Sequence, residues 1–132
     1  MRFVHLQRRD LVAQAVSRHK AEVSGTWQLG IEEAGHPSEP FYDVAQINAY
    51  LHEAIADNAA WRAWFGVNGV LPVQLCYEDL AADPVAATRQ VLRMLGLTVP
   101  AGCGIKAPNR RMADDISADW VRRFRAQMAP AG

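Results

Sequence analysis

The spacing of apolar residues along the chain predicts two short strands. The first contains Phe3, Val4 and Leu6, which favour strand conformation and show no helical period. The second spans residues 71–77, LPVQLCY. Its apolar content predicts burial on both faces, as in a parallel sheet.

Longer segments repeat apolar residues at helical spacing, and each begins with a residue that suits a helix N-terminus. Aspartate side chains accept hydrogen bonds from the first free N–H groups of a helix, and proline fits the first helical position. Glycine commonly follows the last turn. The helices expected on this basis follow Asp10 to about residue 21, Asp43 to about residue 65, Asp83-Pro84 to about residue 95, and Asp115 or Ser117 to about residue 127.

Strands that alternate with helices are typical of an α/β domain, in which a right-handed crossover joins parallel strands and helices cover both faces of the sheet. Two parallel strands leave unpaired edges, which are costly unless something covers them. We therefore expect residues 1–132 to form a single, incomplete domain. It is either the C-terminal part of a larger α/β domain or a chain whose sheet another chain completes.

Composition narrows the function classes. Lysine plus arginine and aspartate plus glutamate balance at 14 each, which argues against a nucleic-acid binder that works by bulk charge. No apolar stretch is long enough to cross a bilayer, and charges interrupt the N-terminus too early for a signal peptide. Cys76 and Cys103 lie far apart and indicate thiols in a reducing cytoplasm, and the histidines show no metal-ligand spacing.

The first candidate binding residues are Arg8 and Arg9, which lie between the first predicted strand and the helix after Asp10. A helix N-terminus favours an anion, and guanidinium groups suit phosphate or sulfate oxygens. The pattern predicts an oxyanion site at the carboxyl end of a strand, where open α/β sheets bind ligands. The alternative is that both arginines are solvated loop charges.

Three further residues have competing interpretations. Trp27 lies in a long loop over residues 24–42, where it could stack on a sugar or a base, or anchor the loop to the core. Glu78 and Asp79 follow the second strand and could serve as an acid–base pair. We interpret them instead as strand-end and cap residues that fix the following turn.

Several segments resemble a known family. RRDLVAQAVS (8–17) and LCYEDLAADPVAATRQVLRMLGL (75–97) are similar to the P-loop-like sulfotransferases that use 3′-phosphoadenosine-5′-phosphosulfate (PAPS). The likeness is closest to the bacterial trehalose 2-sulfotransferase family, which NAAWRAWF (58–65) and SADWVRRFR (117–125) also resemble. The resemblance spans nearly the whole chain and implies a three-layer α/β/α fold with a parallel sheet.

The resemblance also implies roles for individual residues. Arg9 would pair with the 3′-phosphate of PAPS and Ser17 would donate a hydrogen bond to it, with Arg8 as the register alternative for Arg9. Arg110 and Arg111 resemble a late basic segment that closes over the same phosphate. Trp27 is the candidate contact for a carbohydrate acceptor such as trehalose. The resemblance implies no metal.

One part of the family pattern is missing from the sequence. No glycine-rich strand-to-helix loop is present to cradle the 5′-phosphosulfate, and no G-x-x-x-x-G-K-[ST] motif occurs. We therefore expect a C-terminal segment of a sulfotransferase with no catalytic residue of its own and little activity alone. Alternatives are a non-catalytic module that binds adenosine 3′,5′-bisphosphate, or an interaction protein, a homodimer for example, with Trp61, Trp64 and Trp120 as contacts.

Overall fold

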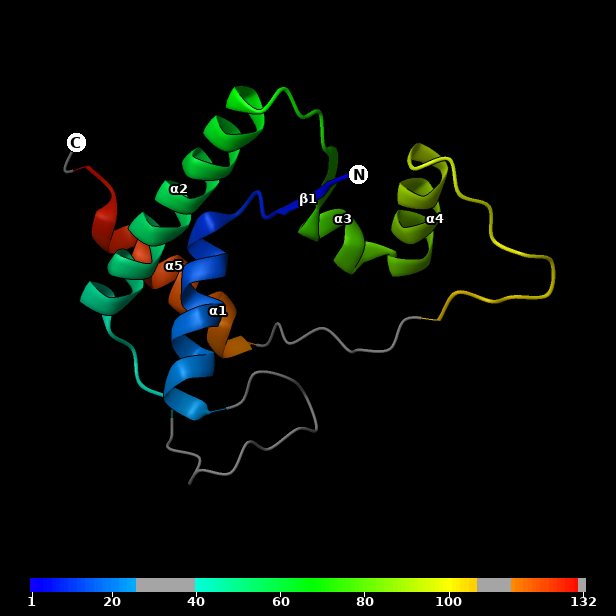
Figure 1. Ribbon diagram of the computed structural model, residues 1–132. Coiled ribbons are helices and arrows are strands. Elements are labelled where there is room, and N and C mark those ends of the chain that lie inside the picture. Colours follow the sequence, from blue (N-terminus) through cyan, green and yellow to red (C-terminus); the bar gives the residue numbers. More distant parts are fainter. Residues whose placement is uncertain (26–39, 107–114, 131–132) are drawn as a thin grey trace. The chain divides into compact units, whose positions relative to one another are not determined.

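The computed structural model describes residues 1–25, 40–106 and 115–130. The chain divides into two compact units, a sheet unit (Met1–Arg9 and Asn58–Pro108) and a helical unit (Asp10–Asp57 and Asn109–Gly132). The elements, labelled in Figure 1, are β1 (Val4–Gln7), α1 (Leu11–Ser24), α2 (Val44–Val67), β2 (Val73–Cys76), α3 (Tyr77–Ala82), α4 (Pro84–Met94) and α5 (Asp115–Met128).

The sheet unit contains the two strands, which pair in parallel as the sequence predicted. Val4 lies opposite Val73 and Gln7 opposite Cys76, so both strands end at the same edge. β2 passes directly into α3 and then α4 (Figure 1). The sequence did not predict α3, whose N-cap residue Cys76 makes no side-chain capping bond.

Burial of the strands on both faces was a wrong prediction. No residue of β2 is fully buried, and Gln74 is exposed. On β1 the side chain of His5 is buried, whereas Val4 and Leu6, which point to the other face, are 43% and 52% exposed. The physical reason is that the described elements of the sheet unit pack only one face of β1, through the end of α2.

Aromatic rings fill the covered side of the sheet unit. Phe65, 7% exposed, has its ring centroid 5.1 Å from that of His5, 5.5 Å from that of Trp64 and 5.7 Å from that of Trp61. Phe3 adds an edge contact to Trp64 at 5.5 Å. Trp61 and Trp64 still remain about half exposed, so they form the rim of this cluster and not its centre.

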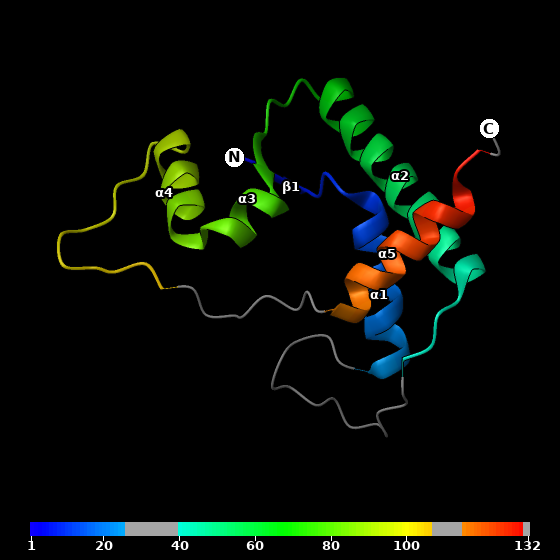
Figure 2. The same ribbon diagram turned by 180° about the vertical axis from the view of Figure 1, so that it is seen from behind.

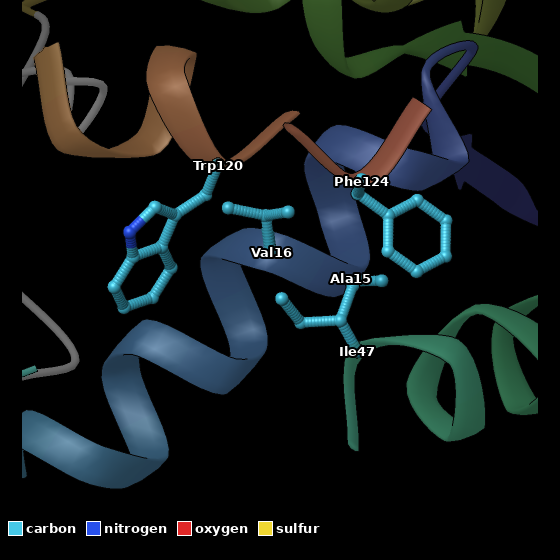
Figure 3. Packing of buried hydrophobic residues seen from close by; sticks show 5 residues of the cluster. All are labelled: Ala15, Val16, Ile47, Trp120 and Phe124. Carbon is cyan, nitrogen blue, oxygen red and sulfur yellow. The ribbon is translucent and has the colours of Figure 1, made fainter. Parts of the chain in front are cut away.

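The helical unit has a closed apolar core. α5 lies across α1 in both views (Figures 1 and 2). Figure 3 shows that side chains from α1, α2 and α5 meet there. The buried cluster consists of Ala15, Val16, Ile47, Trp120 and Phe124. Trp120 therefore belongs to this core, which contradicts its use as a contact with another chain.

Aspartate caps confirm three of the predicted helix starts. The carboxylates of Asp10, Asp43 and Asp83 accept hydrogen bonds at 3.0 Å from backbone N–H groups three residues later. α5 begins at Asp115, the earlier of the two expected positions. The chain is thus α/β with a small parallel sheet and mostly helices, and the crossover, the third layer and the missing elements remain predictions.

Candidate anion-binding site

The arginine doublet lies at the carboxyl ends of the paired strands. β1 ends at Gln7, so Arg8 and Arg9 follow it directly. β2 ends opposite at Cys76, and the next turn of chain carries Glu78 and Asp79. Parallel pairing therefore brings two basic and two acidic residues to one edge of the sheet unit, although about seventy residues separate them in sequence.

Arg9 is the exposed member of the doublet. Its Nη2 lies 2.9 Å from Oδ1 of Asp79, with both side chains more than 60% exposed (66% and 63%). Its backbone N–H donates to Oε2 of Glu78 at 3.0 Å. The hydrogen bond to Asp79, and next the Coulombic attraction of the same carboxylate, raises the pKa of Arg9 above its ordinary value. Arg9 therefore stays protonated, and its guanidinium is in contact with solvent.

Arg8 is held more closely than Arg9. Its side chain is 21% exposed, its guanidinium carbon lies 4.4 Å from the centre of the Tyr77 ring, and its Nε lies 3.9 Å from Oε1 of Glu78. The Nε atom is buried and finds no hydrogen-bond partner among the residues that the structure describes. The ring and the carboxylate leave Arg8 less able than Arg9 to turn toward a ligand.

Glu78 and Asp79 have a role that the sequence interpretation missed. They lie in the first turn of α3, where negative side chains suit the helix dipole, and they also pair with the arginine doublet. Glu78 additionally accepts a hydrogen bond from Sγ of Cys76 at 2.9 Å. A sequence signal did exist, because acidic residues after one parallel strand and basic residues after its neighbour meet at the same edge.

The other candidate residues are less well defined by the structure. Ser17 is half-buried in the second turn of α1, and its pairing with Arg9 stays a prediction. Trp27, Arg110 and Arg111 lie outside the described residues. Asp10 already binds the N–H of Ala13, so the guanidinium of Arg9, more than the helix N-terminus itself, supplies attraction for an anion.

A cavity of about 180 Å³ lies beside the site, between β2, α3 and α4. Asp79 and Asp83 form part of its wall, together with Gln74, Cys76 and Gln90, and none of the described residues that line it is basic. The carboxylates in its wall would repel an anion, so the exposed guanidinium of Arg9 is the better anion-binding group. Within the described ranges no cluster of three potential metal ligands occurs, and no helix is long and apolar enough to span a membrane.

Comparison with known proteins matches the amino-acid sequence to a family. The family model described as Stf0 sulphotransferase matches residues 1–127. A trehalose 2-sulfotransferase of Mycobacterium tuberculosis is 31% identical over 136 residues, covering 98% of this chain and 48% of the relative. One of Mycolicibacterium smegmatis is 30% identical over 122 residues, covering 92% and 45%. The chain spans about half the length of the curated relatives it matches, and the resemblance inferred from its motifs is confirmed.

Proposed function

The chain belongs to the Stf0 sulphotransferase family, and we propose that it supplies the part of a sulfotransferase that holds the 3′-phosphate of PAPS. The intact enzyme would move a sulfuryl group from this donor to a carbohydrate hydroxyl. Trehalose is the acceptor we propose first, because both relatives carry that sugar in their names. In this step the donor's S–O bond to phosphate breaks, the acceptor oxygen bonds to sulfur and gives its proton to a general base that we do not assign to this chain, and adenosine 3′,5′-bisphosphate leaves.

The observation that carries the proposal is the position of Arg9. Its guanidinium follows a strand of a parallel sheet, at the edge where α/β proteins bind ligands, and it is 66% exposed. Its present partner, Asp79, is an exposed carboxylate, and pairs of this kind are weak enough to exchange. A phosphate, with more charge than a carboxylate, is a suitable replacement.

Other residues complete the proposed phosphate site. Ser17 has a hydroxyl that can donate one hydrogen bond, and Arg110 and Arg111 would add positive charge from the segment before α5. Trp27 would stack on the acceptor sugar. The roles of Ser17, Arg110 and Arg111 rest on the resemblance of the sequence motifs to the family, and that of Trp27 rests on the presence of an aromatic residue in the loop expected over residues 24–42. We propose that arginine side chains, and no metal ion, attract the phosphate oxygens of the donor.

Holding the donor is only part of catalysis. Sulfuryl transfer, like phosphoryl transfer, requires the reacting groups to be aligned and the charge on the transferring oxygens to be stabilised. We assign neither task to a residue of this chain. We therefore propose that the chain alone binds the donor nucleotide weakly and transfers sulfate poorly or not at all.

Calorimetry with adenosine 3′,5′-bisphosphate tests the binding proposal. The wild-type chain should bind with heat that saturates, and Arg9→Ala should weaken binding at least about tenfold, since hydrogen bonds to charged groups contribute strongly. Arg122→Ala is the matched control. Arg122 is an equally exposed arginine that pairs at 3.3 Å with Asp119 on α5, far from the doublet in sequence. Its replacement should leave the affinity unchanged.

Two results would contradict the proposal. Equal affinity of wild type and Arg9→Ala would remove Arg9 from the site, and equal affinity for adenosine 5′-monophosphate would show that the 3′-phosphate is not recognised. Transfer of labelled sulfate from PAPS to trehalose, measured with the chain alone, tests the last part. Rapid turnover would refute the expectation of weak activity while leaving the family and the donor intact.

A further inference from the structure

We propose that Asp79 is a built-in competitor for Arg9, a carboxylate that an incoming phosphate must displace and that thereby limits anion affinity at this site. The inference rests on the proposed function, because it takes the displacing anion to be the 3′-phosphate of the donor. It assigns the two acidic residues of α3 different tasks: Asp79 exchanges, whereas Glu78 stays in place.

The contacts of Asp79 suit exchange. Its Oδ1 meets Nη2 of Arg9 at 2.9 Å, and both side chains are largely exposed, so water can replace either partner without a buried charge being left behind. The pair joins the ends of two side chains and involves no backbone atom. Breaking it therefore leaves β1, α3 and the turn between Gln7 and α1 undisturbed.

The contacts of Glu78 suit a fixed support. One of its oxygens, Oε2, accepts both the backbone N–H of Arg9 at 3.0 Å and Sγ of Cys76 at 2.9 Å. The other, Oε1, lies 3.9 Å from Nε of Arg8, and the Glu78 side chain is only 27% exposed. Glu78 thus holds the backbone of Arg9 at the edge of the sheet. This backbone position is kept when the hydrogen bond between Asp79 and the guanidinium breaks.

Charge decides the direction of the exchange. A phosphate monoester carries between one and two negative charges at neutral pH, against one for Asp79, so it is the stronger partner for Arg9. After displacement the Asp79 carboxylate stays near the bound phosphate and repels it. Both effects lower affinity in the wild-type chain. Replacing the carboxylate by an amide of the same size removes the repulsion and leaves only a neutral, weaker acceptor for Arg9.

Calorimetry with adenosine 3′,5′-bisphosphate at low salt tests the exchange. Asp79→Asn should bind about fivefold more tightly than wild type, the size expected for release from one exposed ion pair. The gain should vanish in the Arg9→Ala background and for adenosine 5′-monophosphate. Asp83→Asn is the matched control. It removes the same charge four residues later, where the side chain caps α4 by accepting the N–H of Ala86 at 3.0 Å, and it should change affinity less than about twofold.

The results separate this inference from the proposed function. Binding that ignores Arg9→Ala would defeat both. Binding that requires Arg9 but is unchanged or weakened in Asp79→Asn would defeat the competitor role alone, and weakening would make Asp79 a positioning residue. If Asp83→Asn raised the nucleotide affinity as much as Asp79→Asn does, the gain would come from the loss of one negative charge anywhere near the site. That result would also overturn the inference.

A second measurement does not depend on nucleotide affinity. Phenylglyoxal modifies accessible arginine, and peptide mass spectrometry reports its rate at Arg9 separately. Because Asp79 accepts a hydrogen bond from this guanidinium and stabilises its charged form, Asp79→Asn should raise the rate at Arg9 severalfold and leave that at Arg122 unchanged. Inorganic phosphate should slow the reaction in both proteins. Equal rates in wild type and variant, or no protection by phosphate, would overturn the inference.

Discussion

The two units of the chain differ in where their apolar side chains are placed. The helical unit encloses Val16, Ile47 and Phe124, which are at most 1% exposed. In the sheet unit no apolar residue among those described is so well covered, and Leu6 and Trp61 are about half exposed. Exposed apolar surface of this kind often marks a place where other groups bind. The helical unit thus has a core of its own, whereas the sheet unit has the candidate site and an open surface.

The largest expected effect comes from the centre of the helical core. Replacing Phe124, which is 1% exposed, by alanine should lower the free energy of unfolding of the helical unit by about 3–5 kcal/mol, through lost burial and a cavity that its neighbours cannot fill. Urea denaturation followed by circular dichroism measures the loss. Met128→Ala is the control on the same helix, at a residue that is 52% exposed, and should cost less than about 0.5 kcal/mol.

Replacing a buried phenylalanine of the sheet unit by alanine should destabilise the chain less. Phe65→Ala is expected to lower the free energy of unfolding by about 2 kcal/mol, because the half-exposed rings of Trp61 and Trp64 can move into the space. Val67→Ala, on the same helix at a residue 87% exposed, is the control. If Phe65→Ala proved as costly as Phe124→Ala, the two units would have equally rigid cores and the comparison between them would fail.

Local signals in the sequence explain which elements could be predicted. Asp10, Asp43 and Asp83 each mark a helix start, because capping depends on residues within one turn. The parallel pairing also followed from the alternation of strands and helices. α3 was missed because its six residues follow an apolar strand without a break, and its N-cap residue is Cys76, which makes no side-chain capping bond. Glu78 and Asp79, expected to cap and fix a turn, lie instead in the first turn of a short helix.

The candidate site could be predicted only in part. Arg9 was proposed from its place after a strand and stays a prediction as a binding residue, whereas its pairing with Asp79 joins residues 70 positions apart and depends on the register of the sheet. Burial is equally non-local. Trp61 and Trp120 are the same residue type on apolar helix faces, yet one is 51% exposed and the other 7%. Trp120 lies in the core where α5 packs on α1.

The helix caps offer a smaller comparison between the units. Asp10→Ala and Asp83→Ala each remove a 3.0 Å hydrogen bond at a helix start and should cost about 1 kcal/mol of stability. Asp10 should cost more, since it also pairs with Arg125 at 2.9 Å and is only 36% exposed. Hydrogen exchange of α1 and α4 amides measures each loss locally. Asparagine variants keep the cap, so a full loss in Asp10→Asn would assign the effect to the ion pair instead.

The smallest expected effect tests whether anything besides apolar packing holds the helical unit together. Arg18 and Glu53 approach to 2.6 Å, but their side chains are 42% and 55% exposed. Exposed pairs lose in side-chain entropy and screening most of what they gain in attraction, so Glu53→Gln should cost at most about 0.5 kcal/mol and nothing at high salt.

Asp57→Asn is the matched control, because it removes the same charge from an exposed position of the same helix. The two variants should unfold within about 0.5 kcal/mol of each other in urea. A loss above about 1 kcal/mol that is specific to Glu53 and persists in 1 M salt would show a surface pair acting as strongly as a cap. The stability of the helical unit would then depend on its charges as well as on Phe124 and its neighbours, and the contrast with the sheet unit, where an exposed pair is proposed to exchange freely, would be lost.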